Sequence, residues 1–124
     1  MMKKKTAIDY LFSLTNLGGV HAATLIGRDG FVIECASKKD IDLDALGAVV
    51  STGFGASEVM GSEILLGELG HTIMEYKYGK ILMSACSEEA ILAVVTDNNA
   101  ILGSIRHNMK KVTIELAQII GINV

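Results

Sequence analysis

The chain lacks proline and tryptophan, and only 5% of its 124 residues are aromatic. No repeat, low-complexity tract or linker divides it. The length is enough for one hydrophobic core and too short for two, so we expect a single domain over residues 1–124. Half of the residues are hydrophobic and a fifth are charged, which excludes a disordered protein.

Cysteine is scarce, and this argues against metal and redox chemistry. Cys35 and Cys86 are the only cysteines, they are far apart, and neither has a CxxC partner. Both lie in predicted strands, where small reduced core residues of a cytosolic protein are the simplest interpretation. His21, His71 and His107 show no HxxxH or HxH spacing, so we predict no metal site.

Catalytic and nucleotide-binding motifs are also missing. The sequence has no GxxxxGK[ST], GxSxG or HExxH. The segment GFGASE fails as a dinucleotide loop, because Glu58 stands where the last glycine is needed. Asp40, Asp42 and Asp44 alternate like metal ligands, but the glycine and glutamate of an EF-hand loop are absent. We therefore expect no cofactor and no enzymatic activity.

The charge pattern excludes two further classes. A net charge of −3 and a pI near 5.5 give no basic field for nucleic acid. Lys3, Lys4 and Lys5 form a basic start, but no apolar signal-peptide region follows. The longest uncharged run, Ala45 to Ser57, is too short and glycine-rich to span a bilayer. We expect a cytoplasmic protein without membrane insertion.

Local signals predict three helices and five strands. Thr6 and Asp9 form a capping box for a helix over Ala7–Leu17, and Asp42 is a good N-cap for Leu43–Gly61. The last helix follows Asp97-Asn98-Asn99, which caps it, and ends at Gly121. Its apolar stripe is Leu102, Ile105, Met109, Val112, Leu116 and Ile119.

The strands are predicted from apolar runs joined by turn residues. Arg28-Asp29-Gly30 joins Val20–Gly27 to Phe31–Ala36, and Gly79 joins His71–Tyr78 to Lys80–Cys86. Ala90–Thr96 is apolar on both faces and should be central. The natural packing is an α+β fold with one five-stranded antiparallel sheet in the order α-β-β-α-β-β-β-α. Three helices cannot fully cover both faces of such a sheet.

The segment LDALGAVVSTGFGASEVMG, Leu43 to Gly61, has helical periodicity but no charged outer face. Leu43, Leu46, Val50, Phe54 and Ser57 form the face that suits the sheet. The opposite face carries no charge and consists of Ala45, Ala48, Val49, Thr52, Gly55, Ala56, Val59 and Met60. This pattern favours burial against a partner helix. Two alternatives stay open: the same chain covers this face, or the run is not one continuous helix.

The element order, the small-residue second helix and the stretch LGELGHTIMEYKYGKILMSA…AILAVVTDNNAILGSIRHNM resemble a Roadblock domain. This family includes dynein Roadblock light chains and MglB-like regulators. The resemblance covers nearly the whole chain and is carried by diffuse motifs, namely Gly67, Gly79, the apolar strands and the helix start Ala100–Arg106.

The resemblance implies a homodimer whose third strands pair into a ten-stranded sheet. The second helices would lie side by side on one face, with the first and third helices on the other. The residues at the dimer edge would be His71, Thr72, Ile73, Met74, Glu75, Tyr76 and Lys77. The resemblance also implies a platform for a small Ras-like GTPase, and MglB-like members stimulate GTP hydrolysis without supplying catalytic residues. Arg28 and Arg106, the only arginines, lie outside the second helix, so we assign no arginine finger.

Two other functions remain open at this point. The first is a structural adaptor that dimerises and joins a larger assembly without a GTPase. The second is a small-molecule sensor, since profilin-like sheets share this architecture, but it needs a pocket with converging polar groups and no such set stands out in the sequence.

Overall fold

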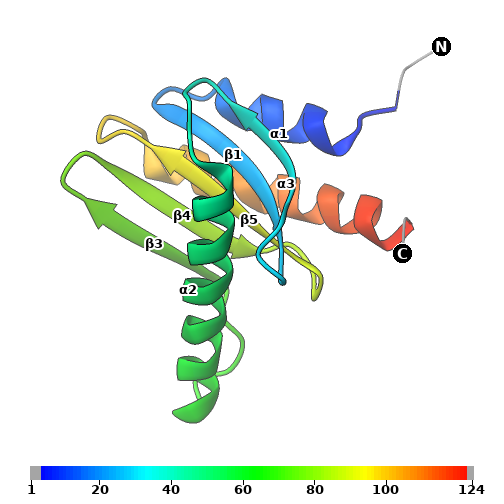
Figure 1. Ribbon diagram of the computed structural model, residues 1–124, viewed down its shortest axis with the longest axis vertical. Helices are drawn as coiled ribbons and strands as arrows, with labels where there is room; N and C mark the ends of the chain where they lie inside the picture. The colour runs from blue at the N-terminus through cyan, green and yellow to red at the C-terminus, as the bar shows by residue number, and fades with distance from the viewer. Residues whose placement is uncertain (1–3, 123–124) are drawn as a thin grey trace.

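The computed structural model describes residues 4–122, which form three helices and one five-stranded antiparallel sheet (Figure 1). In chain order the elements are α1 (Ala7–Thr15), β1 (Val20–Gly27), β2 (Val32–Ser37), α2 (Leu43–Glu63), β3 (His71–Tyr76), β4 (Gly79–Ala85), β5 (Ala90–Thr96) and α3 (Leu102–Ile122). The predicted α+β fold and element order are confirmed.

The sheet has the strand order β2-β1-β5-β4-β3, with every neighbouring pair antiparallel. The strand β5 lies at the centre, as its apolar sequence predicts, and Ala90 to Val94 are fully buried. The strands β2 and β3 are the two edges, so β3 has one side without a hydrogen-bonded neighbour among residues 4–122.

The helices divide between the two faces of the sheet (Figure 1). Helices α1 and α3 pack on one face through a core that includes Leu11, Leu14, Ile105 and Leu116. Helix α2 packs alone on the other face through Leu46, Val50 and Phe54. One face is therefore covered by two helices and the other by one.

The predicted N-terminal caps are present. The backbone N–H of Thr6 donates to Oδ2 of Asp9 at 2.8 Å, which completes the capping box of α1. The N–H of Ala45 donates to Oδ1 of Asp42 at 3.1 Å at the start of α2. These short-range bonds explain why both helix starts could be predicted from the sequence.

Several predicted ends are wrong by a few residues. Helix α1 ends at Thr15, before Leu17, and α2 continues past Gly61 to Glu63. Strand β2 runs from Val32 to Ser37 instead of Phe31 to Ala36. Helix α3 starts at Leu102, directly after Ile101, so Asp97-Asn98-Asn99 ends β5 but does not cap the helix. The helix also continues past the predicted end at Gly121. A glycine within a helix destabilises it by only about 1 kcal/mol relative to alanine, so it does not by itself end the helix.

The β3–β4 hairpin corrects the interpretation of Gly79 as a turn residue. The turn is Lys77-Tyr78, and Gly79 is the first residue of β4, paired with Tyr76. A Cβ at Gly79 would overlap the carbonyl oxygen of Thr96, so the close approach of β5 requires glycine there. Lys77, predicted in the edge strand, therefore lies in the turn, and Cys86 lies just beyond β4.

Candidate interaction surface

Helix α2 is one continuous helix whose predicted outer face is open to solvent in this chain. The exposed fractions are 63% for Val49, 58% for Val59 and 64% for Met60. Seven of the eight predicted residues are exposed, and only Gly55 is half-buried. Neither alternative interpretation holds within residues 4–122, since the helix is unbroken and no other segment covers this face.

The hydroxyl groups on α2 do not make the face polar. On the outer face, Oγ1 of Thr52 donates to the carbonyl oxygen of Ala48 at 2.8 Å, and on the side toward the sheet Oγ of Ser57 donates to that of Gly53 at 2.8 Å. Both side chains thus satisfy their donors on the backbone one turn earlier. The outer face of α2 is therefore effectively apolar.

The apolar surface continues beyond the helix, which the sequence analysis missed. Leu65 is 91% exposed, and Ile64 and Leu66 on either side are also exposed. The N–H of Leu66 bonds to the oxygen of Gly61, and the N–H of Leu65 bonds to that of Ser62, as in a Schellman motif. Leu65 has φ 59°, a left-handed conformation that usually takes glycine. Three consecutive apolar residues after Gly61 were the signal that could have revealed this extension.

The face also adjoins an uncovered part of the sheet. Helix α2 lies closest to β1 and β2, and its C-terminal half extends beyond the ends of the strands (Figure 1). Beside it, Met74 of β3 and Ile81 of β4 are only half-buried, and Tyr76 is exposed. The predicted edge residues His71 to Tyr76 form this open β3 edge. The outer face of α2 and the open edge of β3 are thus two exposed surfaces that leave part of the sheet between them uncovered.

An ion pair fixes the C-terminal half of α2 to the rest of the molecule. The guanidinium of Arg28 in the β1–β2 turn pairs with the carboxylate of Glu58 through both oxygens. The same guanidinium lies 5.5 Å from the centre of the Phe54 ring and reaches the oxygen of Ser87 at 3.4 Å. Glu58, which breaks the dinucleotide motif, therefore has a structural role in holding α2 in place.

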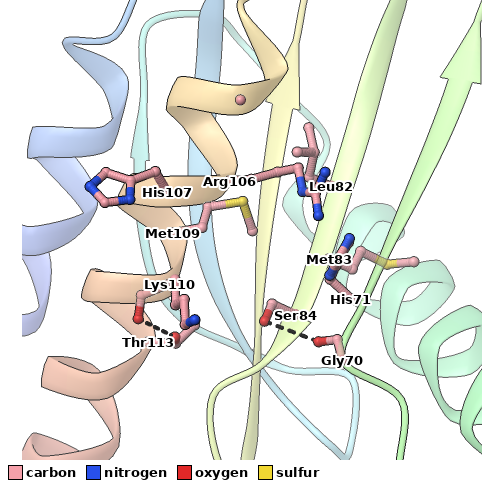
Figure 2. Close-up of a pocket in the computed structure, with 11 residues that line it drawn as sticks. Gly70, His71, Leu82, Met83, Ser84, Arg106, His107, Met109, Lys110 and Thr113 are labelled. Atoms are coloured by element: carbon pink, nitrogen blue, oxygen red, sulfur yellow. Dashed lines mark hydrogen bonds between the residues drawn. The ribbon is translucent and has the colours of Figure 1, made fainter.

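A second feature that sequence reasoning missed is a pocket between α3 and the β3–β4 hairpin (Figure 2). Its volume is about 500 Å³. The side chain of Arg106 extends over the sheet toward Leu82 and His71, whereas His107 extends in the opposite direction (Figure 2). Lys110 lies one helical turn after Arg106 and also lines the pocket. The spacing of Arg106 and Lys110 was the available signal, since residues four apart share a helix face.

The two cysteines differ in environment. Cys86 is 6% exposed, and burial raises the pKa of its thiol from 9.0 to about 12. Its Sγ lies 3.6 Å from the carbonyl oxygen of Thr113, to which it donates. Cys35 is half-buried on β2, with Sγ 3.6 Å from Oγ1 of Thr24. Cys86 is therefore a core residue with very little thiolate at neutral pH.

We expect iodoacetamide at pH 8 to alkylate Cys86 in the folded protein on the order of a thousandfold more slowly than in denaturant. The reason is the pKa of about 12, compared with 9.0 for an ordinary thiol, because the thiolate is the nucleophile. Mass spectrometry of timed samples measures the rate, with Cys35 as the internal comparison. Equal rates for Cys86 in both states would contradict the buried thiol.

No helix within residues 4–122 is long and apolar enough to cross a membrane. In the same range, no group of three or more His, Cys, Asp or Glu side chains could hold a metal ion.

The fold and the surface define an α+β domain that presents an apolar helix beside an open sheet edge. The model of the Roadblock/LC7 domain family matches residues 9–96, and the chain belongs to this family. It is 40% identical over 101 residues to the uncharacterized protein MJ0714 of Methanocaldococcus jannaschii, covering 82% of this chain and 85% of that protein.

Solved structures share the fold. Myxococcus xanthus MglB has a TM-score of 0.87 and 21% identity, and the match covers 97% of this chain and 98% of that chain. Acanthamoeba castellanii profilin IB has a TM-score of 0.60 and 16% identity over 91% of this chain and 98% of that one. The predicted Roadblock/profilin-like architecture is thus confirmed.

Proposed function

We propose that the chain acts as a non-catalytic, homodimeric platform for a small Ras-like GTPase, and that it promotes GTP hydrolysis by reshaping that GTPase. The whole chain, residues 1–124, would act as one Roadblock domain in the cytoplasm. The proposal is supported by membership of the Roadblock/LC7 family and by the shared fold with MglB.

The observation that carries the proposal is the exposed outer face of α2. Large exposed apolar regions on soluble proteins mark interaction sites. Here Val49, Val59 and Met60 are each more than half exposed on a helix whose glycines weaken it as an isolated element. Such a helix gains stability when a second backbone packs closely against its small residues, as a second copy of α2 would.

Affinity capture from native cells tests the GTPase part of the proposal. The wild-type chain and an Ala56→Glu variant serve as baits, each with GDP or a non-hydrolysable GTP analogue. We expect the wild type to enrich a Ras-like GTPase and the variant to lose it, because the platform and the dimer face overlap. The purified GTPase should then hydrolyse GTP faster with the chain than without it.

The same experiment separates the adaptor function from the GTPase platform. A structural adaptor would copurify with a fixed set of proteins that contains no GTPase, whichever nucleotide is present. That result would contradict the proposed GTPase partner while leaving the homodimer in place.

Purified alone, the chain is expected neither to bind GTP tightly nor to hydrolyse it. A P-loop presents free backbone N–H groups before a helix, whereas Gly53 and Gly55 lie inside α2, where their N–H groups are used by the helix. Calorimetric titration with GTP and magnesium measures this. A stoichiometric site with a dissociation constant below about 1 μM would overturn the expectation.

A further inference from the structure

The open edge of β3 presents the backbone groups of alternate residues. Antiparallel pairs alternate between hydrogen-bonded and non-hydrogen-bonded. The N–H of Cys86 bonds to the oxygen of Ala90 at 2.9 Å, which directs the even-numbered residues of β4 toward β5. The odd-numbered residues of β4 then bond to their partners in β3, which are Thr72, Met74 and Tyr76. The residues of β3 whose N–H and C=O groups point to the open edge are therefore His71, Ile73 and Glu75.

The side chains of the same residues lie on the face covered by α3. Ile73 packs against the core under α1 and α3, and His71 lines the pocket between α3 and β3. His71 and Glu75 each lie two residues from Ile73, so all three side chains share that face, since side chains alternate along a strand. His71 and Glu75 are both exposed.

Symmetry limits how a second copy can extend this sheet. If α2 of both copies lies on one face, the two-fold axis is perpendicular to the sheet, and each residue is opposite one on the same face. Odd-numbered residues must then pair with odd-numbered ones. The axis therefore passes midway between the two copies of one β3 residue, and the candidates are Thr72, Ile73, Met74 and Glu75.

Backbone pairing and charge select Ile73. With the axis at Ile73, His71 is opposite the second copy's Glu75, and His71, Ile73 and Glu75 all find hydrogen-bonded partners within the strand. An axis at Met74 places His71 opposite the second copy's Lys77, which lies in the turn. An axis at Glu75 sets two carboxylates opposite each other, which is destabilising. An axis at Thr72 places Glu75 opposite the second copy's Leu69, outside the strand.

The pocket beside His71 has the charge to receive a carboxylate. Arg106 and Lys110 line the pocket, and no acidic residue among residues 4–122 does. Neither of these two basic side chains makes an ion pair within the same range. The positive charge of this pocket is opposite in sign to the net charge of the chain, which is −3. Arginine stays charged at all accessible pH values and binds carboxylates through two parallel hydrogen bonds.

We infer that the second copy's Glu75 completes the pocket between α3 and β3, where Arg106 and His71 bind its carboxylate and so set the register of the dimer on Ile73. The inference rests on the homodimer of the proposed function. Within its own chain Glu75 is opposite Lys80 across the hairpin, but the two form no ion pair within residues 4–122. The carboxylate is thus available to a second copy.

Charge reversal at this contact tests the inference. We expect Glu75→Lys alone, or Arg106→Glu alone, to raise the dimer dissociation constant about tenfold, because each dimer loses two opposite-charge contacts and gains two like-charge ones. An equimolar mixture of the two variants should form heterodimers with near wild-type affinity, since both contacts again join opposite charges. Glu34→Lys on the opposite edge strand β2 is the matched control, with no effect expected.

Disulfide formation tests the register independently. In a Cys35→Ser background, Ile73→Cys should form a disulfide-linked dimer on mild oxidation, because Cα atoms of a hydrogen-bonded pair lie about 5.5 Å apart, within disulfide range. Met74→Cys should not. Crosslinking at position 74 instead of 73 would contradict the register.

The outcomes separate this inference from the proposed function. A wild-type chain that is monomeric overturns both. A dimer that Ala56→Glu disrupts, but that Glu75→Lys and Arg106→Glu leave unchanged, overturns only the contact with Glu75. Weakening by each single variant with recovery in the mixture, together with crosslinking at position 73, supports it.

Discussion

Replacing Ala56 with glutamate is expected to raise the dimer dissociation constant at least about tenfold. Ala56 is exposed on the outer face of α2, near Val49 and Met60. In the proposed dimer the new carboxylate would be buried without a partner and would also fill a close approach between helices. Such a change at an interface amounts to about 2 kcal/mol or more, which corresponds to more than tenfold.

The fold should survive this substitution, because the residues that attach α2 to the sheet are untouched. Leu46, Val50 and Phe54 are buried on the opposite side of the helix. The far-UV circular dichroism spectrum should stay close to that of the wild type, and Val49→Asp should behave in the same way. Analytical ultracentrifugation over a concentration series measures the dissociation constants.

Gln118→Glu provides the matched control for Ala56→Glu, since Gln118 is an exposed residue of α3 on the other side of the sheet. A surface charge there should change stability by less than about 0.5 kcal/mol and leave association unchanged. If Ala56→Glu and Val49→Asp both remain as dimeric as the control, the α2 face is not the interface.

Replacing Gly47 with alanine is expected to destabilise the protein by about 2 kcal/mol. Gly47 is buried on α2, and a Cβ there would overlap the carbonyl oxygen of Gly30 in the β1–β2 turn. Gly30 has φ 91° and cannot easily shift, so the helix itself must move away from the hairpin. Overpacking of this kind is destabilising by about 1–3 kcal/mol. Thermal unfolding should show the midpoint falling by roughly 8 °C.

Gly53→Ala in the same helix should have the opposite effect. A Cβ at Gly53 meets no atom within 4 Å. Alanine should therefore stabilise the helix by about 0.5–1 kcal/mol. Equal stability of the two variants at one protein concentration would show that α2 does not approach Gly30 as closely as the structure indicates.

Features that depend on short stretches of sequence could be predicted. The N-caps at Thr6 and Asp42 act over three residues, and the continuous apolar runs of β1 and β5 set the bounds of these strands directly. The uncharged face of α2 could also be read from the sequence, because the helical period alone separates it from Leu46, Val50 and Phe54.

Features that depend on contacts between distant segments could not be predicted. Gly79 looks like a turn residue until β5 places the oxygen of Thr96 against it. The pocket beside Arg106 exists because α3 packs beside the β3–β4 hairpin, which comes earlier in the chain. The ion pair between Arg28 and Glu58 likewise joins a turn to a helix, and neither residue alone predicts this contact from the sequence.

We expect a second copy of the chain to cover the α2 face and the β3 edge, and sedimentation equilibrium of the wild-type chain at micromolar concentration tests this most directly. A dimer should sediment as a species of about 26 kDa, twice the chain mass of 13.2 kDa. A single species of 13.2 kDa at all concentrations tested would contradict it.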